Sequence, residues 1–561
     1  MSKRILILGA GIMQGPAIRL AKARSWTSIA VDGDENAPCA LEADLFRKID
    51  LKDKDSIEAF ARELAADGGI DGVMTAGTDF SATVAWVAEK LGLPGIPYET
   101  ALDASNKARM RARFRSEGVP SPDFIVLSTI PDPDFMASGK LPFAFPVVVK
   151  PVDNMGSRGC RRVDTAEGLA PAVEDALRFS RSGNAIVEEY MEGPEFSVDA
   201  LVSNGEITIC GLADRHIFYP PYFIEMGHTI PSKLEACQAR ALLEVFENGV
   251  RALGIRNGAA KGDVKLTPRG PMIGEIAARL SGGYMSGWTY PYASGVEPTA
   301  GALSIAVGDK PSNLAPLRSW TCAERAFISI PGQVASLIGL DTARAVPYVR
   351  DLFLRIDEGS QVRFPENNVT KCGNILAAAP TREEAVEAAE TAARAILIRL
   401  APGNSETDSF LVRGPQGAGA FPPDAFPCDA ALLAALDAMP SGGIPLNFRL
   451  PAKPATHPGA KLSSTPKIPD KEADPCLDYL AFPLFGTAPV RDYAGRSVSE
   501  SLEALGWMLG VKFNPVTAAS PDTLAATFWK AMIRGSYQGA AYHIADLVDK
   551  KNKNAVQGGI A

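Results

Sequence analysis

The chain has 561 residues, 46% of them apolar and 22% charged, and a formal net charge of −8. One hydrophobic core does not accommodate this length, so we expect about three or four domains. The acidic balance gives no electrostatic footprint for nucleic acid or an anionic membrane, and no apolar run reaches the roughly 18 residues of a membrane helix. Eight cysteines without a C-x-x-C pair argue against a zinc cluster or a disulfide framework. We therefore expect a protein of a reducing compartment, the cytoplasm.

The first 100 residues alternate between strand and helix patterns. Residues 4–10, RILILGA, predict a buried parallel strand, and the glycines that follow turn the chain into a helix over 16–24. A signal peptide is the alternative for this basic and apolar start, but the run is short and interrupted by glycine. Strand ends at 32 and 79 and a helix over 81–92 follow, and this alternation predicts an open α/β domain.

The first turn contains G-x-G-x-x-x-G at Gly9, Gly11 and Gly15, and Asp32 ends the second strand. This arrangement is consistent with a nicotinamide dinucleotide site, which would make the chain an NAD(P)-dependent oxidoreductase. The motif is weak alone, and nucleotide-binding segments further along the chain compete with it. The oxidoreductase therefore remains an alternative.

A single helix is predicted over residues 101–117, ended by Gly118 and two nearby prolines. Lys107 lies in its first half among four arginines. Such a basic run is usually a solvated helix face.

Two segments between 147 and 201 have the residue types that a nucleotide requires. A β-branched strand ends on Lys150, and a loop with two glycines follows, in which the backbone N–H groups can approach a polyphosphate. About thirty residues on, a second strand ends where backbone N–H and C=O groups could meet a base edge. A surface hairpin with an exposed lysine is the alternative. The candidate residues are Gly156, Ser157, Arg158, Gly159, Glu188, Glu189, Tyr190 and Met191.

Glu225 and His228 follow a Pro-Pro-Tyr-Phe loop that is unusually aromatic for a linker. Aromatic faces beside a carboxylate can form the wall of a pocket for an amino acid or another small polar acid, whereas simple packing of a turn is the alternative. His216 lies upstream of the loop, and a hydrogen-bonded structural histidine is one interpretation of it.

The segment from 258 to 288 predicts two short antiparallel strands joined by a Pro-Arg-Gly turn. Asp263 and Glu275 would lie side by side on this hairpin, and Mg²⁺ is the expected cation between two such carboxylates. Arg279, followed by Gly282 and Gly283, could supply positive charge and backbone N–H groups to a developing oxyanion. A hairpin held by salt bridges alone is the alternative.

Strands and an Ala-rich helix, with a capping box at Thr381 and Glu384, account for residues 319–400. Proline, glycine and alanine then dominate 413–475, which predicts a connector. Two helices, 497–510 and 521–535, are predicted near the end. Their aromatic side chains favour packing over a binding site.

The Lys-Pro strand end, the glycine loop, the Glu-Glu-Tyr-Met hinge and the Gly-x-Glu-x-Ser-x-Asp strand at 193–199 together resemble the ATP-grasp fold, over about residues 4–400. The resemblance implies an α/β and α+β multidomain protein. Its parts would be a Rossmann-like, substrate-side domain over 1–100, two ATP-grasp lobes over 101–318, a C-terminal lobe extension over 319–400, a Pro/Ala-rich connector over 401–475 and a small, mainly helical region over 476–561.

The same resemblance implies roles for individual residues. Lys150 and Lys107 would hold the ATP phosphates, the loop ending at Gly159 would close over them, and the hinge from 188 to 191 would bind adenine. Glu195 or a neighbour would hold the ribose, and His216 stands where many ATP-grasp proteins have a lysine near the nucleotide. The family pattern Glu-x-Asn-x-Arg is matched at Glu275 and Arg279 but not at Ala277, which removes one expected metal ligand.

These roles imply an ATP-dependent carboxylate–amine ligase that resembles L-amino acid ligases, uses ATP and Mg²⁺, and proceeds through an acyl phosphate. Its partners would be a small carboxylate and an amine, with no nucleic acid and no membrane; a homo-oligomer is left open. Ala277 and the unmatched C-terminal region make a non-catalytic ATP-binding regulator a second alternative beside the oxidoreductase. Carboxylase or carbamoyl-phosphate activity ranks lower, because no second ATP-grasp copy, biotinyl motif or glutaminase segment is visible.

Overall fold

The computed structural model describes residues 2–132, 135, 141–311, 314–412, 421–425 and 530–543. These residues belong to two compact units. Unit 1 comprises Met1–Ile217, Gly227–Glu324 and Ala378–Ala385, and unit 2 comprises Phe218–Met226, Arg325–Ala377 and Val386–Ala561. The predicted helix 497–510, most of helix 521–535 and nearly all of the connector lie outside the described residues. None of the described helices is both long and apolar enough to span a membrane.

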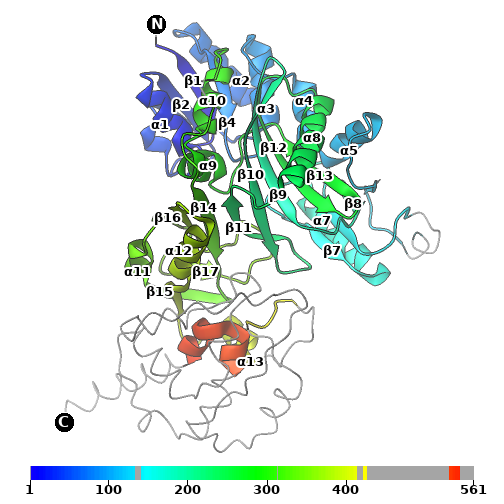
Figure 1. Cartoon of the computed structure of the whole chain (residues 1–561), viewed down its shortest axis with the longest axis vertical. Helices are drawn as coiled ribbons and strands as arrows, with labels where there is room; N and C mark the ends of the chain where they lie inside the picture. Colours follow the sequence, from blue (N-terminus) through cyan, green and yellow to red (C-terminus); the bar gives the residue numbers. More distant parts are fainter. Residues whose placement is uncertain are drawn as a thin grey trace, which may run out of the picture. The chain divides into compact units, whose positions relative to one another are not determined.

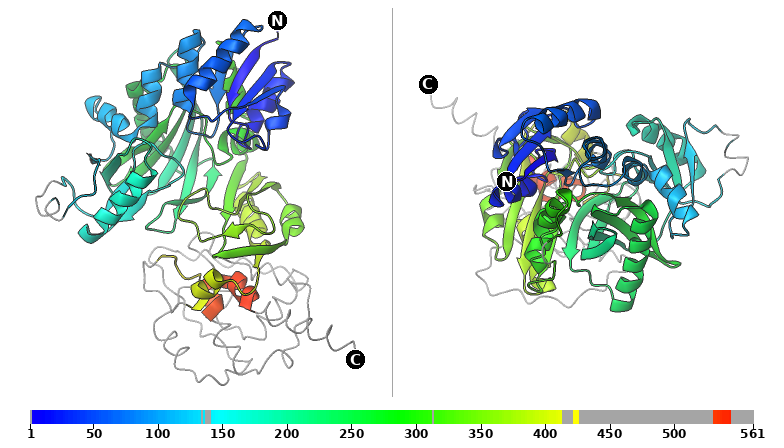
Figure 2. Two further views of the ribbon diagram at one scale, coloured as in Figure 1. Left: turned by 180° about the vertical axis from the view of Figure 1, so that it is seen from behind. Right: turned by 90° about the horizontal axis from the view of Figure 1, so that it is seen from above.

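Unit 1 begins with a parallel sheet in the order β3-β2-β1-β4. Its apolar strands are covered on one face by α2 and α3 and on the other by α1 and by α10, which comes from much later in the chain (Figures 1 and 2). The elements are β1 (Arg4–Leu8), α1 (Gly15–Ala23), β2 (Thr27–Asp32), η1 (Ala40–Glu42), β3 (Leu45–Lys48), α2 (Lys54–Ala66), β4 (Gly72–Thr75), α3 (Ser81–Leu91) and α10 (Pro298–Ala306).

The helix predicted over 101–117 is two helices, α4 (Tyr98–Ser105) and α5 (Lys107–Ser116). The prediction of one continuous helix is wrong because Asn106 has extended backbone dihedrals and caps α5, accepting hydrogen bonds from the N–H groups of Ala108 and Arg109. This break places Lys107 in the first turn of α5.

A second sheet has the antiparallel order β5-β8-β6-β7 and packs one face against α7. Val147 and Val149 of β6 point into that core, and strand alternation therefore places Lys150 on the other face. The elements are β5 (Phe124–Leu127), β6 (Val147–Pro151), β7 (Arg161–Val163), η2 (Ala166–Gly168), α7 (Leu169–Phe179) and β8 (Ala185–Glu189).

Part of an eight-stranded sheet has the order β13-β12-β9-β10-β11, with α8 packed on one face. The predicted hairpin at 258–288 is confirmed as β12 and β13. The elements are β9 (Glu195–Ser203), β10 (Glu206–Phe218), β11 (Ile224–Ile230), α8 (Ala236–Leu253), β12 (Gly258–Thr267), β13 (Gly270–Ala277), the π-helical turn η3 (Met285–Thr289) and α9 (Tyr290–Ser294).

Strand and helix patterns also alternate after residue 320. Reciprocal hydrogen bonds between Thr381 and Glu384 confirm the predicted capping box before α12. The elements are β14 (Thr321–Phe327), β15 (Gly332–Ile338), α11 (Leu340–Ala345), β16 (Val349–Leu354), β17 (Gln361–Val362), β18 (Gly373–Ala379), α12 (Arg382–Arg394), β19 (Leu397–Leu400) and α13 (Ser405–Val412).

Unit 2 includes a helix over 530–543 that is buried along nearly its whole length. Gln538 donates to the Ser329 hydroxyl at 2.6 Å and the Ile398 carbonyl at 3.0 Å, and its own carbonyl accepts from the Ile330 N–H at 3.0 Å. Residues far apart in the sequence therefore share the core of unit 2, together with α13, which lies within the predicted connector.

Candidate active site

The site is organised around the hairpin of β12 and β13. Asp263 and Glu275 are directly opposed in the antiparallel register, so the prediction that they lie side by side is confirmed. On the neighbouring strand β9, Ser197 is opposite Asp263, and its hydroxyl lies 3.5 Å from the carboxylate. Residues that oppose one another in register point to the same face of a sheet. The two carboxylates therefore belong to one polar face of unit 1.

Two cations that the sequence reasoning missed hold Asp263. Lys261 forms an ion pair with one carboxylate oxygen, and Arg215 approaches the other at 3.0 Å. Lys261 is two residues from Asp263 along β12, and Arg215 is opposite Glu195 across β9 and β10. Lys261 could be predicted from the sequence, because residues two apart on a strand point to the same face. Arg215 could not, because its position beside Asp263 depends on the register between β9 and β10.

Glu275 is surrounded by positive charge. Burial alone would raise the pKa of its carboxyl, but Lys107, Lys261 and Lys150 outweigh burial and lower that pKa to about 2. The Lys107 ammonium is 3.5 Å from Glu275. Glu275 is therefore ionised at neutral pH and can bind a cation.

Lys107 joins this carboxylate to the glycine loop. Its side chain is buried, and its Nζ donates a hydrogen bond to the Asn154 carbonyl at 2.9 Å. Burial would lower the pKa of Lys107, but Glu275 and Asp79 raise it above its ordinary value, so the ammonium keeps its charge. Lys107 thus lies in the site rather than on a solvated basic face.

The glycine loop reverses direction through three left-handed residues, Gly156, Ser157 and Gly159, with φ of 69°, 61° and 65°. A Cβ on Gly159 would lie 2.8 Å from the ring of Phe179, so glycine is required there both by φ and by space. Arg158 donates from Nε to the Met155 carbonyl at 3.1 Å, which holds the loop in a compact turn.

Lys150 is positioned by a buried ion-pair network. Its Nζ is 2.7 Å from Glu188, whose other oxygen is 2.9 Å from Nε of the fully buried Arg111. Burial would raise the pKa of Glu188, but Arg111 and Lys150 lower it. The predicted adenine contact Glu188 therefore has its side chain committed to orienting Lys150.

The rest of the predicted hinge makes several contacts. Glu189 pairs with Arg269 at 2.6 Å, and the Tyr190 N–H donates to the Pro146 carbonyl at 3.3 Å. The Met191 carbonyl accepts a hydrogen bond from Lys265 at 3.1 Å, and the same ammonium is 3.8 Å from Glu195. Lys265 therefore links the hinge to the predicted ribose-binding residue.

His216 is not on the polar face. Its Nε2 is 3.0 Å from the Thr229 hydroxyl, and strand alternation places it opposite in direction to Arg215. These contacts favour the structural histidine over the nucleotide contact, and Arg215, one residue earlier, is a cation beside Asp263.

The loop after β13 is tied to the end of β4. Leu280 forms an isolated parallel bridge with Ala76, and the Leu280 carbonyl accepts from the Gly77 N–H at 3.2 Å. Asp199 fixes the following residue by accepting from the Ser281 N–H at 3.2 Å. This loop contains the predicted oxyanion residues, and Gly283 adopts a left-handed φ of 60°. The N-terminal sheet and Arg279 are thereby held in one arrangement.

Asp79, just beyond the end of β4, also belongs to this region. Burial raises its pKa, against the opposing influence of Arg279, Lys107 and Arg181. The sequence offered one signal, since polar residues beyond the carboxyl ends of parallel strands often line a ligand crevice.

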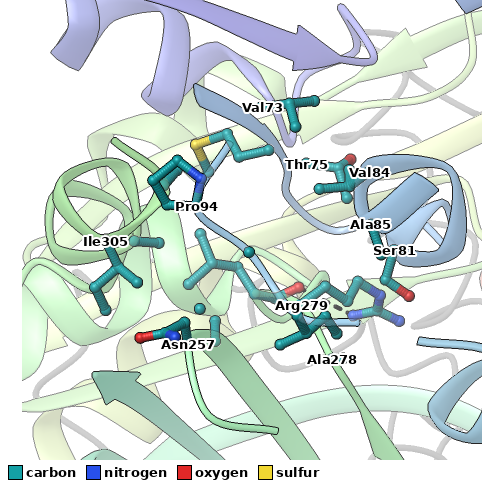
Figure 3. Close-up of a pocket in the computed structure, with 18 residues that line it drawn as sticks. Val73, Thr75, Ser81, Val84, Ala85, Pro94, Asn257, Ala278, Arg279 and Ile305 are labelled. Carbon is teal, nitrogen blue, oxygen red and sulfur yellow. Dashed lines mark hydrogen bonds between the residues drawn. The ribbon is translucent and has the colours of Figure 1, made fainter. Parts of the chain in front are cut away.

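A small cavity of ≈ 70 Å³ lies beside Arg279, and Figure 3 shows the Arg279 side chain along it. Its lining is mostly apolar, with contributions from β4, α3 and α10. An apolar wall lowers the local dielectric, which strengthens the interaction of the guanidinium with a developing negative charge. Lining residues labelled in Figure 3 include Val73, Thr75, Ser81, Val84, Pro94 and Ile305.

The predicted substrate residues Glu225 and His228 belong to different units. In unit 1, Nδ1 of the buried His228 is 2.9 Å from the buried carboxylate of Glu324. In unit 2, the Glu225 N–H donates to the Asn368 side chain at 2.7 Å, and the Glu225 carbonyl accepts from Lys371 at 2.6 Å. The sequence reasoning left Asn368 and Lys371 unassigned.

The glycine motif of the N-terminal turn is occupied by the chain's own side chains. The Ala10 N–H donates to Asp32 at 2.8 Å, and the Gly11 N–H donates to the Gln14 side chain at 2.9 Å. A Cβ on Gly9 would lie 2.8 Å from Gln14. These N–H groups are therefore already bonded, which disfavours the dinucleotide alternative.

The donor set for a divalent cation consists of two carboxylates. Among the described residues there is no group of three or more His, Cys, Asp or Glu side chains arranged to hold a metal ion. Mg²⁺ is commonly held by one or two carboxylates together with substrate phosphates and water, so Asp263 and Glu275 fit one such ion.

Comparisons with known proteins define the class. Residues 143–287 match the ATP-grasp domain family, and residues 326–401 match the family described as L-amino acid ligase C-terminal domain 2. The chain therefore contains an ATP-grasp domain followed by a C-terminal domain of the L-amino acid ligase type. The resemblance inferred from the sequence is confirmed.

The similar proteins include carboxylate–amine ligases. The chain is 26% identical over 360 residues to the uncharacterized protein y4rH of Sinorhizobium fredii, covering 63% of this chain and 73% of that protein. It is 26% identical over 244 residues to the L-arginine-specific L-amino acid ligase of Bacillus subtilis, covering 42% of this chain and 58% of that ligase. The L-amino acid ligase of Bacillus licheniformis has the same fold, with a TM-score of 0.62, 21% identity and coverage of 71% of this chain and 99% of that one.

Proposed function

We propose that this chain is an ATP-dependent carboxylate–amine ligase that joins small substrates, of which at least one is an amino acid. The observation that carries the proposal is the convergence of Lys107, Lys150 and Arg279 on Glu275, beside the glycine loop. In such an arrangement the cations can bind the phosphates of ATP and a reacting carboxylate, and the ionised carboxylate can bind a divalent cation. The C-terminal domain of L-amino acid ligase type supports the choice of amino acids.

In the first step, a substrate carboxylate oxygen attacks the γ-phosphorus of ATP. The bond to the β–γ bridging oxygen breaks, ADP leaves with that electron pair, and an acyl phosphate forms. Lys150 and Lys107 neutralise the phosphates, and the glycine loop encloses them. Catalysis of this kind depends mostly on positioning and electrostatic stabilisation.

In the second step, the neutral amine of the other substrate attacks the acyl carbon. The carbonyl electrons move to oxygen, where Arg279 and the N–H groups at Gly282 and Gly283 stabilise the oxyanion. Collapse of this intermediate breaks the bond to phosphate, and the nitrogen loses a proton to give the amide. Asp79 is a buried carboxyl whose charge interacts with Arg279, and we assign it to holding the amine substrate.

Asp263 and Glu275 would hold Mg²⁺, which would supply positive charge to the ATP phosphates. Residues 188–191 would bind adenine, Glu195 would hold the ribose with Lys265 beside it, and His228 would contact the substrate. In this proposal residues 1–100 are the Rossmann-like domain and 101–318 the ATP-grasp lobes. The extension, connector and helical region keep their expected boundaries.

The test is ADP and phosphate release from Mg-ATP across a set of amino acids and small carboxylates, alone and in pairs. We expect a particular acid to stimulate release and Lys150→Ala to reduce it by about 10²-fold or more. Lys90→Ala, on α3, is the control for loss of a lysine outside the site. ATP binding without stimulation by any pair would refute the ligase and favour the regulator.

A further inference from the structure

Lys261 occupies a position that bears on how many metal ions the site holds. On β12 it is opposite Ala277 of β13, two pairs along from the Asp263 and Glu275 pair and so on the same face. On its other side it is opposite Asp199 of β9. Its ammonium is therefore presented to the polar face between three carboxylate-bearing positions.

The contacts of Lys261 agree with that register. Its ammonium forms an ion pair with Asp263 and is among the charges that act on both Glu275 and Asp199. Arg215, 3.0 Å from the other Asp263 oxygen, completes the set around that carboxylate. The negative charge of the hairpin is thus already met in part by cations of the chain itself.

A second divalent ion would need further oxygen ligands at this end of the hairpin. Mg²⁺ requires six oxygen ligands in near-octahedral geometry. Ala277 presents a methyl group there, and the residue opposite it is the cation Lys261, which cannot accept a hydrogen bond or ligate a metal while protonated. The side-chain chemistry of this pair opposes a metal ion and supplies a fixed positive charge.

We propose that the Lys261 ammonium takes the place of a second metal ion, so that this chain binds one divalent cation with its nucleotide rather than two. The inference rests on the proposed function, since it concerns the same ATP site. It accounts for alanine at position 277 in an active ligase. A metal ligand at 277 would help to bind a second cation, and the Lys261 ammonium on the opposite strand supplies that positive charge instead.

The number of bound cations tests this directly. Mn²⁺ replaces Mg²⁺, and the free ion is followed by electron paramagnetic resonance while the full chain is titrated at saturating ADP. We expect one nucleotide-dependent Mn²⁺ per chain in the wild type and in Ala277→Asn, and two in the double variant Lys261→Met, Ala277→Asn. The matched control pairs Ala277→Asn with Lys90→Met, which removes a positive charge on α3 outside the site, and should bind one.

Any of three outcomes would overturn the inference while leaving the ligase assignment intact. They are two bound ions in the wild type, two in Ala277→Asn alone, and one in the double variant Lys261→Met, Ala277→Asn. Failure of any Mn²⁺ to bind with ADP would refute both. Turnover gives a second readout: kcat of Lys261→Met should fall about 10²-fold, as when one charge-stabilising group is lost. Raised Mg²⁺ should restore the double variant but not Lys261→Met, and an unchanged kcat in Lys261→Met would contradict the proposal.

Discussion

Glutamine in place of Glu188 should destabilise unit 1 by about 3–5 kcal/mol, the cost of removing one partner from a buried ion pair. Glu188 is 2% exposed and Arg111 is completely buried, and the two charges are 2.9 Å apart. The Arg111 guanidinium also donates to the Gly274 carbonyl at 2.6 Å, so it cannot turn to solvent without losing that bond. Glutamine preserves the shape of the side chain but leaves the guanidinium without a counter-charge.

Urea unfolding at pH 7, followed by hydrogen exchange of β6 and β8, measures this loss. The neighbouring variant Glu189→Gln is the control, because its partner Arg269 has a side chain 61% exposed and such surface pairs contribute only about 0.2–1 kcal/mol. Equal losses in the two variants, or a loss below about 1 kcal/mol in Glu188→Gln, would refute the role of the buried network.

The same network predicts the sign of a pH effect. Arg111 and Lys150 hold the folded pKa of Glu188 below its ordinary value despite burial. Its contribution is therefore complete above the unfolded carboxyl pKa of about 4.3 and is lost as pH falls through the lower folded value. The stability difference between wild type and Glu188→Gln should be constant from pH 6 to 8 and shrink in acid.

Three further predictions follow from other contacts. Gly159→Ala places a methyl group against Phe179 at a residue with φ of 65°. ATP affinity measured by calorimetry should therefore fall by about 1–2 kcal/mol. The control Gly118→Ala, where φ is also positive but the space is open, should leave ATP affinity unchanged. Gln538→Leu removes a hydrogen-bond partner from Ser329, Ile330 and Ile398 and leaves the buried Ile330 N–H without its Gln538 acceptor, which costs about 1–3 kcal/mol. The urea midpoint of unit 2 should therefore fall, and an unchanged midpoint would contradict the packing of helix 530–543. Because the pKa of Glu275 is about 2, its carboxylate should stay ionised between pH 5 and 8, and nucleotide-dependent Mn²⁺ affinity should not fall in that range through its protonation. A fall in affinity between pH 5 and 8 that disappears in Glu275→Gln would refute this low pKa.

Parts of the site with a local signal could be predicted from the sequence. The hairpin of β12 and β13 follows from its short turn, whereas the pairing of Asp263 with Glu275 also depends on a β-bulge between Asp263 and Val264 that shifts the register by one residue. The left-handed turn ending at Gly159 follows from the glycines themselves. The break at Asn106 also had a local signal, an N-cap residue before a helix, but a continuous run of helix-forming residues concealed it.

Residues that depend on register between distant strands could not be predicted. Arg215 and His216 are adjacent, and only the pairing of β10 with β9 determines which of them faces Asp263. Asp79 reaches the site because Ala76 bridges to Leu280, a contact about 200 residues apart in sequence. Such contacts arise from packing of whole elements, and no short pattern records them.

The departure at Ala277 illustrates how this limit affects functional inference. From the sequence of β13 alone, the absence of asparagine at position 277 removes a metal ligand and suggests weakened catalysis. The strand pairing shows that Ala277 is opposite Lys261, whose ammonium pairs with Asp263 and acts on Glu275. A ligand lost on one strand and a cation present on the opposite one form a single arrangement. In the proposed function, the pair of strands meets the electrostatic requirement at the ATP phosphates, and this weighs against the non-catalytic alternative.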